Sequence, residues 1–181
     1  MPFALGLGAN LPSRGESAVG TLGQALDCLE DLVGSLQVGP LYRSRPLAAR
    51  RQRAAPPQQD YFNTVAVGRT VLSPDAVLAL AKGLELAAGR ALVARPGERD
   101  GPRPLDIDLL LYGDTVSQRR ELRLPHPRLL ERRFALAPLA AIAPHWPVPP
   151  GGDSVSHHLA ALGEEQWLVE IPWPDAGPRP S

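Results

Sequence analysis

The stretch Gly101–Gly113, GPRPLDIDLLLYG, decides the fold. Its apolar run ends at a glycine, which is typical of a buried strand. Side chains of a strand alternate between the two faces, so Asp106 and Asp108 are expected on one face, with Cα atoms about 6.8 Å apart. Four apolar residues are expected on the opposite face: Leu105, Ile107, Leu109 and Leu111.

The chain before this stretch supplies a strand, a helix and two further strands. Residues 3–8 are a short apolar run, and residues 17–33 have the apolar spacing of an amphipathic helix. Residues 36–42 and 61–71 have strand character and are expected to form a hairpin. The connection 43–60 is polar, broken by proline and much longer than a usual hairpin loop, so it is expected to act as a lid.

A second helix is expected after these strands. Ser73 is expected to cap it, with Pro74 at its first position and Gly89 beyond its end. Together with the strand 105–112 the order is β-α-β-β-α-β. We therefore predict an α+β, ferredoxin-like fold, with helices on one face of an antiparallel sheet.

A C-terminal extension follows these six elements. We expect a short strand from Leu122, a helix at 156–162 and an edge strand at 167–171. Residues 1–172 are predicted to form one domain, and residues 173–181 a disordered tail.

Bulk properties narrow the classes of function. The 19 basic and 19 acidic residues balance, so no overall field attracts nucleic acid or anionic lipid. One cysteine, Cys28, excludes an internal disulfide, and the apolar spacing around it predicts a buried thiol. No signal peptide and no membrane-spanning run are recognisable, so a cytoplasmic location is expected.

The paired aspartates are the first candidate for chemistry. Two carboxylates on an apolar strand need compensating positive charge, and a hard cation such as Mg²⁺ supplies it. The alternative is that both face water or pair with arginine. Arginines upstream favour a polyphosphate ligand, because its charge exceeds what one or two divalent ions neutralise. These arginines are Arg90, Arg95, Arg99 and Arg103.

Two other stretches carry polar side chains near apolar runs. LPHPRLLERRFAL (124–136) presents His126 between two prolines, where it could donate to a phosphate or be an ordinary turn residue. GLGAN (6–10) lacks the third glycine and the following helix of a dinucleotide-binding motif. It leaves open a glycine turn that lets Asn10 approach a ligand.

From its first strand to about Pro144, the chain resembles the 6-hydroxymethyl-7,8-dihydropterin pyrophosphokinase family of folate biosynthesis. The paired motifs GPRPLDIDLLLYG and LPHPR, in this order, are highly specific. The other matching pieces are GLGANL, LYRSRPL, QDYFNTVA and LELAAGR. The resemblance implies transfer of pyrophosphate from ATP to the hydroxymethyl group of the pterin, with release of AMP.

The resemblance also implies roles for individual residues. Asp106 and Asp108 would hold two Mg²⁺, and Arg90 and Arg103 would brace the transferring group. ATP would be bound by Arg99, Arg103, His126 and Arg132. Tyr61 and Phe134 would sandwich the pterin, whose edge would be read by Asn63 and by backbone at Ser44 and Leu47, while Glu85 would position the arginine loop.

Departures from the family pattern leave alternatives open. Asp100 replaces a usual tryptophan, Arg45 replaces a frequent proline, and the second loop arginine matches either Leu92 or Arg95. A binding homologue with impaired transfer is one alternative, and an RNA-binding ferredoxin-like module is another. A monomer that binds neither nucleic acid nor membrane is expected, acting beside other folate-pathway enzymes.

Overall fold

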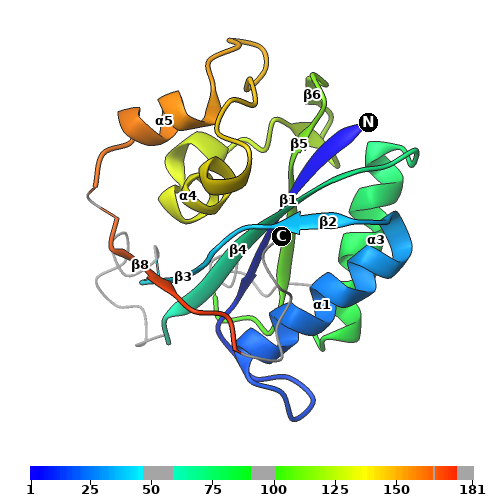
Figure 1. The fold of residues 1–181 in the computed structure, drawn as a ribbon. Coiled ribbons are helices and arrows are strands. Elements are labelled where there is room, and N and C mark those ends of the chain that lie inside the picture. The colour runs from blue at the N-terminus through cyan, green and yellow to red at the C-terminus, as the bar shows by residue number, and fades with distance from the viewer. Residues whose placement is uncertain (47–58, 91–100, 165, 175–181) are drawn as a thin grey trace.

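The computed structural model describes residues 1–181 except 47–58, 91–100, 165 and 175–181. Its centre is an antiparallel sheet in the order β5-β1-β4-β3-β8, with β2 also paired to β4. Figure 1 shows this sheet between two layers of helices. The predicted α+β class with an antiparallel sheet is confirmed. The sheet strands are β1 (Pro2–Ala9), β2 (Leu36–Val38), β3 (Leu41–Ser44), β4 (Tyr61–Arg69), β5 (Asp106–Tyr112) and β8 (Leu168–Ile171).

The hairpin predicted on either side of the long connection is present, because Ser44 pairs with Tyr61 across β3 and β4. The single strand predicted at 36–42 is instead two short strands, β2 and β3. They are separated at Gly39 and Pro40, where proline offers no backbone N–H for the ladder. The C=O of Gly39 accepts a hydrogen bond from Thr64 Oγ1 at 2.9 Å, which fixes the break.

Helices α1 (Ala18–Val33) and α3 (Pro74–Ala87) cover one face of the sheet, as predicted. Ser17 and Ser73 cap them by accepting hydrogen bonds from Gly20 N–H and Ala76 N–H. The prediction of a buried Cys28 is wrong, because this thiol is exposed. The helix does bury the apolar stripe from which burial was inferred, which runs through Leu22, Ala25, Leu26 and Leu29, but Cys28 lies to one side of it.

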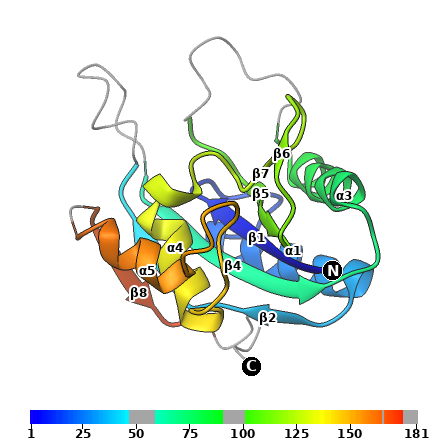
Figure 2. The same ribbon diagram turned by 90° about the horizontal axis from the view of Figure 1, so that it is seen from above.

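The C-terminal extension covers the opposite face with α4 (Arg133–Ile142) and α5 (Val155–Ala161) (Figure 2). The helix at 156–162 was predicted, but α4 was not. Its proline, Pro138, suggests a turn, yet the helix is held by Leu136 and Leu139, which are buried against the sheet. This extension also contains η1 (Leu129–Glu131), β6 (Ser117–Gln118) and β7 (Arg123–Leu124).

Strand β5 carries an irregularity that changes which side chains share a face. Its register with β1 shifts between Leu109 and Leu111, which leaves Leu110 as an extra residue. Leu109 therefore packs with α1 and α3, whereas Leu110 and Leu111 both belong to the core beneath α4. The prediction that Leu111 lies on the face of Leu105 and Ile107 is wrong for this reason.

The predicted edge strand near the C-terminus is β8, which pairs with β3. Trp173, which the sequence assigned to the tail, packs against the core and its Nε1–H donates to Gly39 O at 3.3 Å. Of the predicted tail, residues 175–181 lie outside the described residues. Among the helices of the described part of the chain, none combines the length and apolar character needed to cross a membrane.

Candidate active site

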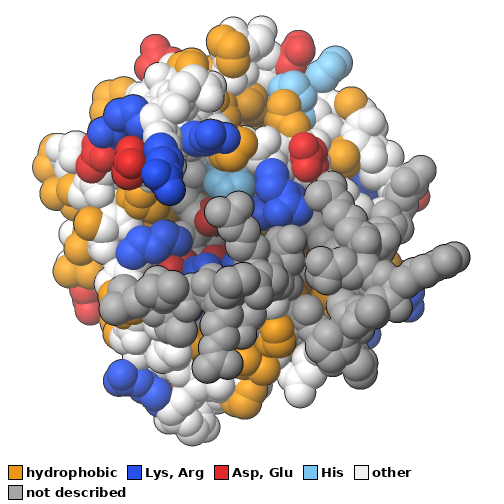
Figure 3. All heavy atoms as spheres, turned by 180° about the vertical axis from the view of Figure 1, so that it is seen from behind, with side chains coloured by type: hydrophobic (Ala, Val, Ile, Leu, Met, Phe, Trp, Pro, Cys, Tyr) orange, Lys and Arg blue, Asp and Glu red, His pale blue; other side chains and the backbone are white. Residues whose placement is uncertain are grey.

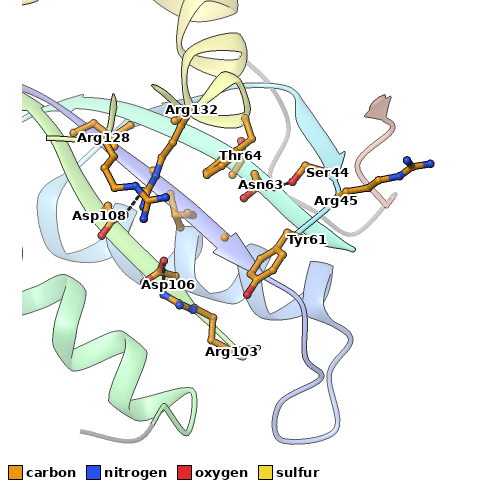
Figure 4. A pocket seen from close by; sticks show the side chains of 16 residues that line it. Ser44, Arg45, Tyr61, Asn63, Thr64, Arg103, Asp106, Asp108, Arg128 and Arg132 are labelled. Carbon is orange, nitrogen blue, oxygen red and sulfur yellow. Dashed lines mark hydrogen bonds and ion pairs between the residues drawn. The ribbon is translucent and has the colours of Figure 1, made fainter. Parts of the chain in front are cut away.

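A cleft opens on the sheet face that α4 partly covers. Figure 3 shows basic side chains gathered around a hollow that also holds acidic side chains and a histidine. Figure 4 shows its two sides, with Asp106 and Asp108 on β5 and Asn63 and Ser44 on β4 and β3. The residues lining it are Gly6, Leu7, Gly8, Ser44, Arg45, Tyr61, Asn63, Thr64, Arg103, Asp106, Asp108, Leu110, Arg128, Arg132, Phe134 and Ala135.

Glycines of β1 form the floor of this cleft. Gly8 pairs with Asp106 and Gly6 with Asp108 in the antiparallel register. A Cβ on Gly8 would come within 3.1 Å of Asn63 Oδ1, and one on Gly6 within 3.2 Å of Leu110. Because glycine has no side chain, Gly6 and Gly8 leave room in the cleft between the carboxylates and Asn63. The sequence prediction used this motif only for Asn10.

Arginines neutralise both carboxylates. Arg90 Nη1 donates to Asp106 Oδ1 at 2.6 Å, and Arg103 Nη1 donates to Asp106 Oδ2 at 2.9 Å. Arg132 Nη1 donates to Asp108 Oδ2 at 2.9 Å. Burial acts to raise the pKa of Asp106, but the guanidiniums of Arg103 and Arg90 outweigh it and hold this pKa below its ordinary value. We call five residues the charged wall, of which four line the cleft and Arg90 supports Asp106 from beside it: Arg90, Arg103, Asp106, Asp108 and Arg132.

For the two aspartates the sequence left open a bound metal ion or, as the alternative, pairing with arginine. Pairing with arginine is the arrangement in this structure. In the described residues, no further histidine, cysteine or acidic side chain joins them in a group of three suited to a metal ion. Arg132 Nε is buried without a hydrogen-bond partner among those residues. A buried donor without a partner is unusual, and it marks this end of the charged wall as suited to an anionic ligand.

His126 lies beside the second carboxylate. Its Nε2 is 3.6 Å from Asp108 Oδ2, and its Nδ1 accepts a hydrogen bond from the N–H of Arg128 at 3.2 Å. Burial lowers the pKa of His126, aided by Arg132 and opposed by Asp108. Because Nδ1 accepts a hydrogen bond, the neutral form of the ring carries its proton on Nε2, the atom that lies beside Asp108.

Asn10 and Glu85 act beside the cleft rather than in it. Asn10 is buried, and its Oδ1 accepts a hydrogen bond from Arg103 N–H at 2.8 Å, while its own N–H donates to Arg103 O at 3.0 Å. Glu85 Oε1 lies 2.5 Å from Arg90 Nη1. Asn10 thus fixes the backbone at Arg103, and Glu85 fixes the side chain of Arg90.

The opposite side is a neutral wall: Ser44, Tyr61, Asn63 and Phe134. Asn63 Nδ2 donates to Ser44 Oγ at 2.9 Å, and both residues are 5% exposed. Tyr61 Oη donates to Gly101 O at 2.8 Å, which links this wall to the segment leading into β5. Phe134 connects the walls, because the Arg132 guanidinium lies 5.6 Å from the centre of its ring.

Five positions that the sequence analysis singled out lie outside the described residues: Leu47, Leu92, Arg95, Arg99 and Asp100. Other cleft residues, notably Arg128 and Thr64, had no predicted role. Arg45, at the rim, turns away from the cleft, and its guanidinium lies 5.0 Å from the centre of the Trp167 ring.

Carboxylates neutralised by arginine can exchange those partners for a metal ion and the phosphates of a nucleotide. An antiparallel sheet that presents them beside a neutral hydrogen-bonding pocket suits a nucleotide-using transferase of phosphate-containing groups.

Comparison with known proteins identifies a particular family within this class. Residues 4–144 match the family model 7,8-dihydro-6-hydroxymethylpterin-pyrophosphokinase. A 2-amino-4-hydroxy-6-hydroxymethyldihydropteridine pyrophosphokinase of Synechocystis is 38% identical over 138 residues, which are 75% of this chain and 69% of that protein. A folate synthesis bifunctional protein of Chlamydia caviae is 34% identical over 177 residues, which are 94% of this chain and 36% of that protein.

A crystal structure of Plasmodium falciparum HPPK-DHPS with pteroate superposes with a TM-score of 0.66 at 13% identity. The match covers 88% of this chain and 44% of that one, and it shows that the fold is shared. This chain thus spans less than half of each of the two longer proteins.

The chain belongs to the 7,8-dihydro-6-hydroxymethylpterin-pyrophosphokinase family. It is an ATP-using enzyme that transfers pyrophosphate to hydroxymethyldihydropterin in folate synthesis. The predicted family and reaction are confirmed.

Proposed function

We propose that the charged wall carries out this transfer with two Mg²⁺ held by Asp106 and Asp108, while the neutral wall holds the pterin. The observation that carries the proposal is the pair of carboxylates on one face of β5, each bonded to arginines that a triphosphate can also bind.

The two carboxylates suit Mg²⁺ in number and kind. Mg²⁺ is usually bound by one or two protein carboxylates, and substrate phosphates and water complete its six oxygen ligands. The side chains of Asp106 and Asp108 are 23% and 26% exposed, so a nucleotide can reach both. Bound Mg²⁺ would neutralise the triphosphate and polarise the phosphorus under attack.

The arginines have a second set of partners in this proposal. With Mg²⁺ held by the carboxylates, the guanidiniums of Arg90, Arg103 and Arg132 would bind phosphate oxygens. They would stabilise the charge that develops while the hydroxymethyl oxygen bonds to the β-phosphorus and releases its proton to water, and while the bond between the β-phosphorus and the bridging oxygen breaks, so that AMP leaves. Neutral His126 donates its Nε2–H to a phosphate oxygen.

The neutral wall binds the second substrate. Asn63, fixed by Ser44, offers amide groups that complement the hydrogen-bonding edge of a pterin. Tyr61 and Phe134 supply aromatic faces for a flat ring. Reaction then depends on the distance between the two walls rather than on a strong base in the protein.

The test measures AMP release from ATP, Mg²⁺ and 6-hydroxymethyl-7,8-dihydropterin. Asp106→Ala is expected to lose more than about a hundredfold in rate, on the scale of removing one main charge-stabilising group. Asp114→Ala is the matched control, because Asp114 is an exposed aspartate just after β5. A wild-type rate in Asp106→Ala would refute the metal assignment.

The same assay separates an efficient enzyme from an impaired homologue. Calorimetry with an unreactive ATP analogue, Mg²⁺ and the pterin reports binding independently of turnover. Binding heat in the wild type together with AMP release supports the proposal. Binding heat without AMP release would instead show a ligand-binding relative that has lost transfer.

A further inference from the structure

Strand β5 is an outer strand of the sheet, and within the residues that the structure describes no strand lies along its other edge. Ile107, between the two aspartates, lies opposite Leu7 of β1. Both backbone polar groups of Ile107 turn away from β1 and toward α3. Its N–H donates to Glu85 Oε1 at 2.7 Å, and its C=O accepts from Lys82 Nζ at 3.1 Å. Two helix side chains therefore satisfy the groups that another strand would bind.

These side chains also bind one another. Lys82 Nζ lies 2.8 Å from Glu85 Oε1, at an i,i+3 spacing that faces both toward β5. Glu85 is 3% exposed, so its carboxylate depends on the three donors around it: Lys82, Ile107 N–H and Arg90. Arg90 in turn reaches Asp106. Contacts thus run without a gap from Lys82 to the charged wall.

We propose that Lys82 is a positioning residue for the metal site. With Glu85 it holds the backbone of Ile107, and so sets the spacing of Asp106 and Asp108 and the direction of Arg90. This inference rests on the proposed function, because it concerns how firmly the two carboxylates hold metal ions.

The role differs from that of an ordinary surface ion pair, which contributes little to stability. One ammonium group bridges a buried carboxylate and a backbone carbonyl, so its loss leaves two acceptors short of a donor. Mutation of a residue that orients metal ligands typically lowers metal affinity by about 10- to 100-fold. Because the Lys82 side chain is 45% exposed and water can replace part of its contact, we expect about tenfold.

The test compares Lys82→Met with the wild type by two measurements that do not depend on turnover. The first is Mn²⁺ affinity, from electron paramagnetic resonance with an unreactive ATP analogue. The second is the hydrogen-exchange rate of the Ile107 amide, from NMR. Lys82→Met is expected to weaken Mn²⁺ binding about tenfold and to speed exchange at Ile107.

Two variants serve as controls. Lys82→Arg keeps a donor that reaches both acceptors, and it should restore most of the Mn²⁺ affinity. Arg119→Met removes a cation that pairs with Asp75 at the other end of α3, in an exposed contact. It should leave both measurements at wild-type values.

Wild-type Mn²⁺ affinity in Lys82→Met, alongside lost affinity in Asp106→Ala, overturns the positioning role alone. Unchanged affinity in both variants overturns the metal site and this inference with it. A lower melting temperature in Lys82→Met without a change in metal affinity means that Lys82 is merely structural, and it also overturns the positioning role.

Discussion

The charged wall and the neutral wall face the same cleft, but they are held in place differently. On the charged wall, two arginines bind Asp106 and one binds Asp108, and the side chains of these arginines are 14% to 28% exposed. On the neutral wall, Asn63 and Ser44 are 5% exposed and hold one another by a single hydrogen bond. Ion pairs hold the side chains of the charged wall, whereas burial and a hydrogen bond hold those of the neutral wall.

This difference bears on how the two substrates bind. The neutral wall already has a defined geometry, so a pterin would meet preset groups at little cost in ordering. In the proposed mechanism, the charged wall would exchange its arginine–aspartate pairs for contacts with metal and triphosphate. Changes in the charged wall should therefore affect the rate, whereas changes in the neutral wall should affect pterin affinity.

The largest effect is expected at Arg103. Arg103→Ala removes a partner of Asp106 and a charge that the proposal directs at the transferring phosphates. We expect kcat to fall about 10²- to 10³-fold, the range for a main electrostatic group. Arg103→Lys keeps the charge but not the planar fork, so its loss should be smaller. AMP release measures both, and a near-normal kcat in Arg103→Ala would contradict the division of roles.

A smaller effect is expected at Phe134. Phe134→Ala should weaken pterin binding about tenfold, because an aromatic stacking partner contributes about 0.5–1.5 kcal/mol beyond its buried area. Nucleotide affinity should change by no more than about fivefold, the scale of one partly exposed cation–π contact with Arg132. Calorimetry with each ligand gives both values. A larger loss for nucleotide than for pterin would show that Phe134 belongs to the charged wall.

Ser44 offers a finer test of the neutral wall. Ser44→Ala removes the acceptor that fixes Asn63, and one net hydrogen bond is worth about 1 kcal/mol. Pterin affinity should fall about fivefold, with kcat little changed. Ser44→Thr keeps a hydroxyl and serves as the control. Equal pterin affinity in the alanine variant would mean that Asn63 needs no partner to read the pterin.

The smallest expected effect is a pH dependence of stability. The pKa of His126 is lowered by burial from an ordinary value of 6.5. In the window just below pH 6.5 the unfolded chain therefore binds more protons than the folded one, so the unfolding free energy falls as the pH drops. Urea titrations without metal or nucleotide should show a weaker pH dependence in His126→Asn than in the wild type.

The exposed His157 provides the control for that measurement. His157→Gln should retain the pH dependence of the wild type. Identical dependence in His126→Asn and the wild type would show that burial of the His126 ring does not disfavour its charged form.

Much of the fold could be predicted because local signals act within one element. Apolar spacing gave α1, apolar spacing with a serine cap gave α3, and alternation gave the carboxylate pair on β5. The failures have a non-local cause. Helix α4 contains Pro138 and depends on packing against the sheet, and the register shift at Leu110 appears only when β5 is paired with β1.

The same distinction between local signals and non-local contacts applies to the residues of the site. Asp106 and Asp108 are two residues apart on one strand, so their shared face could be predicted from sequence. The bond between Asn63 and Ser44 joins two strands, and the contacts of Lys82 and Glu85 with Ile107 require α3 to lie along the open edge of β5. Spacing alone does not show such contacts.

The central claim is tested most directly by a crystal structure with Mn²⁺ and an unreactive ATP analogue. The account predicts two anomalous-scattering peaks within coordination distance of Asp106 and Asp108, with Arg103 and Arg132 turned from these carboxylates to phosphate oxygens. Bound nucleotide with no peak at the carboxylates, and with the arginines still bonded to them, would contradict it.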